Sequence, residues 1–152
     1  MKRVFRTDSP CIVGAMRAAT RRLTQLYDEA MAPTGLRITQ FQILSELARR
    51  ASDPPTISDL AEILTMERSA LGQTLRPLER DGFIDLSHDE RDGRRRPVRL
   101  TRAGKEKVIS ARRHWVRAHE NSEHFLGKKQ LVLLRETLRE IAESPRLPET
   151  FQ

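Results

Sequence analysis

The sequence of 152 residues contains one cysteine, one tryptophan and one tyrosine. The single cysteine, Cys11, excludes an intrachain disulfide, and so low a cysteine content is typical of a cytoplasmic protein. The apolar run at residues 131–134 is far too short to cross a membrane. The basic N-terminus is not followed by an unbroken apolar stretch, so it does not match a signal peptide. We therefore expect a cytoplasmic protein without a membrane partner.

Motifs of the common catalytic and cofactor sites are also missing. We find no glycine-rich phosphate loop, no nucleophile elbow and no paired carboxylates at the end of a strand. Two pairs, His119 with Glu123 and Glu120 with His124, have the i, i+4 spacing that could chelate a metal on a helix. A solvated helix surface is the simpler interpretation of these pairs. We expect no enzyme activity, no cofactor and no metal.

Composition and charge favour a folded protein that meets polyanions. Hydrophobic residues make up 38% and charged residues 32%, a balance that favours one folded domain spanning residues 1–152 over a disordered chain. The net charge is +7, and residues 88–117 hold eleven Lys or Arg against four Asp or Glu. The rest of the chain has seventeen of each sign, so the whole excess lies in that segment. Such a concentration predicts nucleic acid as the partner, with a solvated basic helix face as the alternative.

A helix is predicted near the N-terminus. Ser9-Pro10 reads as an N-cap followed by proline at the first helical position, and "APTG" at 32–35 ends the helix. Its apolar residues recur at spacings of four and three and form one stripe, namely Ile12, Met16, Ala19, Leu23, Leu26 and Ala30.

Three shorter helices are expected next. A capping box of Thr39 with Gln42 opens the first, whose inward face carries Phe41, Leu44 and Leu47. "SDPP" at 52–55 ends it, and a second capping box, Thr56 with Asp59, precedes "LAEIL" at 60–64. After a short turn, residues 68–82 form another helical stretch that closes on glycine.

The apolar period then changes from helical to two. Residues 83–87 and 98–100 alternate as strands, and Asp92-Gly93 supplies a turn between them. Pro97 cannot donate a ladder hydrogen bond, so its strand is expected at an edge. Thr101 then caps a long helix, in which a stripe recurs at spacings of three and four, namely Val108, Ala111, Trp115, Ala118, Ser122 and Phe125. After Gly127 a last helix repeats the pattern with Leu131, Leu134, Leu138 and Ile141.

Together these elements predict a mainly α fold with a small β-wing, an α+β winged helix-turn-helix. The helices at 56–64 and 67–81 have the layout of a helix-turn-helix, whose second helix enters the major groove of DNA. Its expected DNA contacts are Arg68, Ser69, Gln73, Thr74 and Arg76. Arg and Gln carry forked polar groups that match the edges of guanine and adenine. Plain helix packing is the alternative for the helix pair alone.

The hairpin after the second helix would be the wing. Its arginines can contact phosphates or the narrow, electronegative minor groove. The expected wing contacts are Arg91, Asp92, Arg94, Arg95 and Arg96. Double-stranded DNA is therefore the predicted partner.

At this point the sequence resembles the multiple-antibiotic-resistance regulator (MarR) family of winged-helix transcription factors, over nearly the whole chain. The wing stretch "DGRRRPVRLTRAG" fits the family pattern without a gap, at Asp92, Arg94, Val98, Leu100, Thr101 and Gly104. "LYDEAMAPTGLRITQFQILSEL" also looks like the end of the family's first helix and its second helix. In two departures, Pro77 is expected to kink the second half of the recognition helix, and Glu67 stands where a better N-cap is usual.

The resemblance implies a homodimer with one recognition helix on each half-site of an inverted-repeat operator. Residues 36–104 would form the winged helix-turn-helix, while 9–35 and 105–145 would form dimerisation helices. Arg94 would be the wing-tip contact, and Asp92 would brace its guanidinium. Most relatives are repressors, and many release DNA on binding an aromatic or lipophilic acid. The effector pocket is expected at Met16, Phe41, Leu44 and Trp115.

The apolar stripes also predict a dimer without the resemblance. A winged domain offers too little surface to cover all three flanking helices, so a second copy is the expected cover. The interface residues would be Ile12, Met16, Leu131, Leu134, Leu138 and Ile141. The alternative is that these helices pack only on one another within one chain.

Three other functions stay open. Cys11 could sense peroxides or thiols, although a lone cysteine on an apolar helix face is more often a small core residue. The chain could instead coat or shape DNA without sequence preference. Binding to a membrane surface fits less well, because the basic segment includes a hairpin and is not one amphipathic helix.

Overall fold

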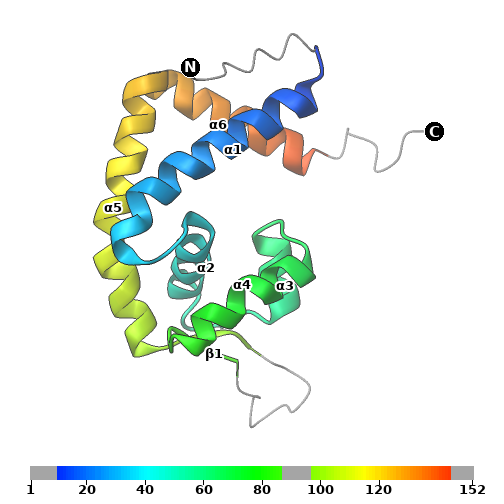
Figure 1. Cartoon of the computed structure of the whole chain (residues 1–152). Helices are drawn as coiled ribbons and strands as arrows, with labels where there is room; N and C mark the ends of the chain where they lie inside the picture. Colours follow the sequence, from blue (N-terminus) through cyan, green and yellow to red (C-terminus); the bar gives the residue numbers. More distant parts are fainter. Residues whose placement is uncertain (1–9, 87–96, 145–152) are drawn as a thin grey trace, which may run out of the picture. The chain divides into compact units, whose positions relative to one another are not determined.

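The computed structural model describes residues 10–86 and 97–144 (Figure 1). The chain groups into two compact units, residues 1–115 and residues 116–152. The elements in order are α1 Ile12–Met31, the 3-10 turn η1 Ala32–Thr34, α2 Ile38–Arg49, α3 Ile57–Ile63, α4 Arg68–Arg80, β1 Ile84–Asp85, β2 Arg99–Leu100, α5 Arg102–Leu126 and α6 Lys128–Glu143. The predicted fold class, helices with a small β-wing, is confirmed. None of the described helices is long and apolar enough to cross a membrane.

The core of the first unit is built around α2. This helix contacts α1, α4 and β2, and α4 in turn contacts α3 and β1. Ile43 and Leu44 of α2, Leu60 of α3 and Leu71 of α4 are fully buried. Val98, just before β2, is buried with them. The apolar spacing seen in the sequence therefore brings the helix-turn-helix and the base of the wing onto one core.

Two helices begin at places other than those predicted. For α1 the N-cap position is Cys11, and the helix starts at Ile12. For α2 the predicted capping box of Thr39 with Gln42 is wrong, because the helix already begins at Ile38. The carboxylate of Asp28 in α1 accepts the Ile38 N–H at 2.8 Å. Its other oxygen accepts a hydrogen bond from the Arg37 side chain at 3.1 Å. A cap from the preceding helix thus sets the start of α2.

The turn between α3 and α4 closes in a strained conformation. As predicted, α3 begins with a capping box, in which Thr56 and Asp59 exchange hydrogen bonds of 2.9 and 3.2 Å. At its end the Met66 N–H reaches Ala61 O at 2.8 Å and the Thr65 N–H reaches Glu62 O at 3.1 Å. This is the Schellman pattern, which favours glycine at the left-handed position. Here that position is Thr65, with a φ of 52°.

The wing base is a short antiparallel pair. Ile84 pairs with Leu100 and Asp85 with Arg99, so the strands are shorter than the predicted 83–87 and 98–100. The edge predicted at Pro97 is partly covered, because Pro97 forms a bridge with Thr56. The adjacent Val98 N–H donates to Pro55 O at 2.8 Å. The segment before α3 therefore holds the second strand of the wing from its other side.

A corner of three hydrogen bonds starts α5. The Thr101 hydroxyl donates to Gly82 O at 2.6 Å and accepts from the Gly104 N–H at 3.0 Å, which confirms Thr101 as the cap. The Thr101 N–H also donates to Phe83 O at 3.1 Å. A Cβ on Gly104 would lie 2.1 Å from Phe83 O, so only glycine fits. Close packing in this corner therefore explains the Leu-Thr-x-x-Gly end of the wing pattern.

The second unit leaves apolar residues exposed. On the apolar stripe of α5, Ala118 and Ser122 are buried, whereas Phe125 is 86% exposed. Phe125 stands at the end of α5, two residues before the turn at Gly127, where no described residue covers it. On α6 no residue is fully buried, with Leu138 at 39% and Ile141 at 37% exposure. The described residues of one chain therefore leave the apolar stripe of α6 partly exposed to solvent.

A buried carboxylate lies on α2. Glu46 has 7% of its side chain exposed and is bonded by Arg49 and by Arg50, whose Nε lies 2.7 Å from Oε1. Burial pushes the pKa of Glu46 upward, but the hydrogen bonds and charges of Arg50 and Arg49 outweigh it. The net result is a pKa below the ordinary glutamate value.

We predict that Gly104→Ala lowers the free energy of unfolding by about 1–3 kcal/mol, because the new methyl group overlaps the Phe83 carbonyl. Urea denaturation would measure the change. Gly72→Ala is the matched control on α4, since nothing lies within 4 Å of the added Cβ. It should instead stabilise the chain by about 0.5–1 kcal/mol. Equal effects of the two substitutions would contradict the packing argument.

We also predict that Glu46→Gln lowers the free energy of unfolding at neutral pH by about 1–2 kcal/mol, because charge-assisted hydrogen bonds are lost. With a folded pKa below the unfolded one, the glutamate's contribution is complete above the unfolded pKa. It is lost as the pH falls through the lowered folded pKa. The gap between wild type and variant, measured by urea denaturation at several pH values, should therefore shrink in that acid window. A gap independent of pH would count against this assignment.

Candidate nucleic-acid interface

The two sides of α4 differ in chemistry. Leu71, Leu75 and Leu78 are buried, each at most 1% exposed. Spacings of four and three place Ser69, Gln73 and Arg76 on the opposite side, where all three are exposed. Three of the five predicted contacts therefore share one open face. Their role as contacts stays a prediction.

Thr74 and Arg68, the other two, lie elsewhere on α4. Thr74 is half-buried, and its hydroxyl donates to Ala70 O within the helix at 2.9 Å. Arg68 precedes Leu71 and Leu75 by three and seven residues, so it continues the buried stripe at its exposed N-terminal end. The helical spacing in the sequence already separates Arg68 and Thr74 from the other three residues, so the predicted set combined residues from different faces of the helix.

Arg80 extends the open face and was missed by the sequence analysis. It follows Arg76 by one turn, is exposed, and pairs with Asp81 at 3.1 Å. Pro77, between them, lies inside α4 without ending it. Because proline has no N–H, the carbonyl of Gln73 loses its helical donor and can accept from water or a ligand. The kink predicted at Pro77 stays a prediction.

The predicted wing contacts Arg91, Asp92, Arg94, Arg95 and Arg96 lie outside the described residues.

The base of the wing, by contrast, is well defined. The exposed Asp85 and Arg99 face each other across the strand pair, an arrangement of opposite charges that stabilises a hairpin. Lys107 of α5 lies 5.2 Å from the centre of the Phe83 ring, a cation–π contact. The base of the wing is therefore fixed to α5.

Most of the basic excess lies on α5 and not on the wing. Residues 88–101 hold five arginines against three acids, whereas residues 102–117 hold six Lys or Arg against one Glu. Arg102, with 93% of its side chain exposed, pairs with Glu106 at 3.0 Å. Lys105, Arg112 and Arg113 are also exposed. A separate count of the two segments could have found this from the sequence.

The predicted effector residues are partly brought together. Phe41 and Trp115 stack with ring centroids 6.5 Å apart and planes at 27°. Leu44 is fully buried in the core, and Met16 is half-buried on α1. Their role as an effector site stays a prediction.

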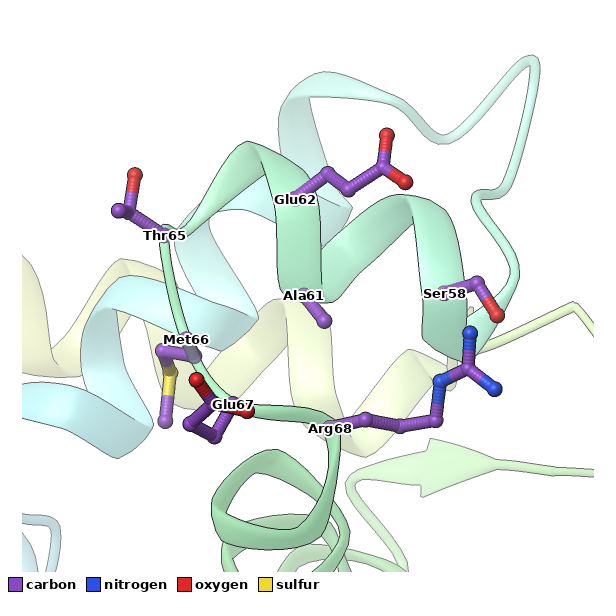
Figure 2. Close-up of a pocket in the computed structure, with 7 residues that line it drawn as sticks. All are labelled: Ser58, Ala61, Glu62, Thr65, Met66, Glu67 and Arg68. Atoms are coloured by element: carbon purple, nitrogen blue, oxygen red, sulfur yellow. The ribbon is translucent and has the colours of Figure 1, made fainter. Parts of the chain in front are cut away.

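An open hollow lies instead at the helix-turn-helix, with a volume of about 500 Å³. Figure 2 shows its lining, which comes from α3, the turn and the start of α4: Ser58, Ala61, Glu62, Thr65, Met66, Glu67 and Arg68. None of these except Arg68 was singled out from the sequence as a site residue.

Cys11 and the histidines were the remaining candidates from the sequence, and a redox role of Cys11 stays a prediction. Cys11 is exposed at the start of α1, so its interpretation as a small core residue is wrong. His119 Nε2 lies 3.6 Å from Glu123 Oε1. Within residues 10–86 and 97–144, no three side chains of the metal-binding types gather into a cluster.

Comparison with known proteins agrees with this geometry. The model of the MarR family matches residues 34–95, from the end of η1 to the wing. The MosR transcriptional regulator of M. tuberculosis, solved in complex with DNA, is 29% identical. That likeness covers 90% of this chain and 99% of MosR, with a TM-score of 0.75. The chain therefore resembles the MarR family over its winged helix-turn-helix, the part that the family model matches.

MarR proteins are DNA-binding transcriptional regulators with a winged helix-turn-helix, which confirms the prediction that the chain is not an enzyme. The transcriptional activatory protein BadR of Rhodopseudomonas palustris is 34% identical over 77 residues. These residues make up 50% of this chain and 44% of BadR, so the chain spans under half of that relative. BpsR of Bordetella bronchiseptica, whose DNA binding is regulated by 6-hydroxynicotinic acid, shares the MarR fold at 18% identity. This structural likeness covers 91% of this chain and 98% of BpsR, with a TM-score of 0.80.

Proposed function

We propose that the chain is a dimeric transcriptional repressor that binds an inverted-repeat operator in double-stranded DNA. Each copy would place α4 in the major groove of one half-site and the wing arginines, Arg94 foremost, on the adjacent backbone or minor groove. The observation that carries the proposal is the open face of α4, which sets Ser69, Gln73 and Arg76 opposite the buried leucines. The solved complex of MosR with DNA supports it.

Electrostatic attraction would supply much of the affinity for DNA. The excess on residues 88–117 attracts a polyanion before any base is contacted, and it makes binding depend on salt. The larger part of that charge lies on α5, which continues directly from the second strand of the wing. Charge on α5 would therefore speed association, whereas side chains on α4 would decide the sequence.

The dimer is supported by apolar surface that the described chain does not cover. Ile12 is 65% exposed at the start of α1, and Leu138 and Ile141 are more than a third exposed on α6. Met16, Leu131 and Leu134 are half-buried. A second copy of the chain would cover these positions and present two recognition helices to two half-sites.

Release from the operator would follow from an effector of the aromatic or lipophilic acid class. The DNA binding of BpsR is regulated by 6-hydroxynicotinic acid, and in this chain the stacked Phe41 and Trp115 bring two aromatic rings together at the predicted effector site. The effector must bind the DNA-incompetent arrangement more tightly, because only differential affinity shifts the equilibrium. It would change the spacing of the two recognition helices.

Activation of transcription is the second candidate, favoured by the name of BadR as an activatory protein. A reporter gene driven by a promoter containing the operator separates the two directions. Repression predicts that expression rises when the protein is absent and activation predicts that it falls. No change in either direction would exclude regulation at that promoter.

We predict that Gln73→Ala weakens binding to the operator by about 1–3 kcal/mol but leaves binding to a scrambled duplex nearly unchanged. Gel shifts with the region upstream of the gene, at two salt concentrations, would measure both affinities. Gln42→Ala, the same change on an exposed position of α2, is the control and should change neither. A wild type that binds both duplexes equally would indicate a sequence-neutral DNA-binding protein instead.

We predict that Leu138→Asp gives monomers or aggregates in size-exclusion chromatography, because a carboxylate would be placed in the apolar seam. Leu133→Asp is the control on the same helix. Leu133 is 55% exposed and lies five residues from Leu138, on another face of α6. A well-behaved dimer from Leu138→Asp would remove this stripe from the interface.

A further inference from the structure

Arg68 belongs to a different surface from the other arginines of α4. Its spacing from Leu71 and Leu75 aligns it with the buried stripe and not with Ser69, Gln73 and Arg76. It is nevertheless exposed, because α4 begins there and the core ends. A base-reading role, expected from the sequence, would require it to share the open face.

Figure 2 shows where this side chain goes. In this view the Arg68 guanidinium extends toward the side of the hollow that carries Ser58, near the start of α3. The carboxylates of Glu62 and Glu67 point away from it in the same view. Ser58 and Arg68 therefore bring two hydrogen-bond donors from two helices to one edge of the hollow.

Neither donor is used within the part of the chain that the structure describes. Arg68 forms none of the ion pairs found there, in contrast to Arg37, Arg49, Arg50, Arg80 and Arg102. Ser58 does not cap α3, because Thr56 does so. A guanidinium and a hydroxyl that converge without an acid between them are suited to an anion such as a phosphate.

We propose that Ser58 and Arg68 together hold one phosphate of the DNA backbone, so that Arg68 positions the recognition helix and does not read a base. This rests on the proposed function. In a helix-turn-helix the first helix crosses the backbone while the second enters the groove. A phosphate at the junction of α3 and α4 is therefore where the backbone would run. Contacts of this kind fix the register of the helix and carry no sequence information.

The test compares Arg68→Ala with wild type on the operator and on a scrambled duplex over a series of salt concentrations. The phosphate contact predicts that both affinities fall by the same factor. It also predicts that the slope of log affinity against log salt decreases by about one. A larger loss on the operator than on the scrambled duplex would make Arg68 a base reader. Unchanged affinity on both would remove Arg68 from the interface, and either result overturns the proposal.

Ser58→Ala supplies the second arm. Alanine suits a helix interior and leaves the Thr56 cap in place, so the fold should be kept, which thermal unfolding would check. If both residues hold the same phosphate, the double variant should lose less affinity than the two single losses combined. Additive losses would mean two separate contacts and would overturn the shared site.

Two controls separate the sources of failure. Arg21→Ala removes an exposed charge on α1, outside residues 88–117, and should leave the ratio of the two affinities and the salt slope nearly unchanged. Inorganic phosphate at constant ionic strength should not compete with the duplex, and specific competition that Arg68→Ala abolishes would make the hollow a small-anion site instead. A wild type that binds no duplex would refute the proposed function itself.

Discussion

The corner at Thr101 is the constraint on which the geometry of the interface depends. One hydroxyl joins Gly82, at the end of the recognition helix, to the first turn of α5. Phe83 O accepts the Thr101 N–H and approaches Gly104 so closely that no side chain fits. Because α4, both strands and α5 meet within these few residues, the end of the recognition helix and the base of the wing hold one fixed relation. A DNA-binding surface that is formed by two separate elements needs such a rigid connection, because loops alone would let the two elements move independently.

Features encoded by neighbouring residues could be predicted from the sequence, and features that depend on distant residues could not. The Thr56–Asp59 box and the Thr101 cap lie within one turn of the helices they start, so local pattern was sufficient. The start of α2 was misplaced by two residues, because Asp28, ten residues away on another helix, accepts the Ile38 N–H and adds to the local bond from the Arg37 N–H to Gln40 Oε1. Phe125 lies on the apolar stripe of α5 and is nevertheless exposed, because periodicity gives the direction of a side chain and not whether another residue packs against it.

The site was predicted in the same uneven way. The five predicted contacts of α4 were chosen by their place in the helix and by residue type, and only Ser69, Gln73 and Arg76 share its open face. Residue type indicates what a side chain can bind, and only its angular position indicates whether it reaches the same ligand. The charge shows the same limit, because one total for residues 88–117 concealed that α5 outweighs the wing. At physiological salt the field of such a cluster decays over about 8 Å, so its position matters as much as its size.

The turn at Thr65 bears on how an effector could act. A β-branched residue at a φ of 52° costs roughly 1–2 kcal/mol, and the structure keeps it because two backbone hydrogen bonds and the buried Leu60 and Leu71 fix the helices on each side. An effector that bent this turn would have to break those contacts, for which a small ligand offers little compensation. Under the proposed function, the winged helix-turn-helix would therefore move as a rigid body. Regulation would then depend on the distance between two copies of it, so dimerisation would be a condition for response as well as for binding.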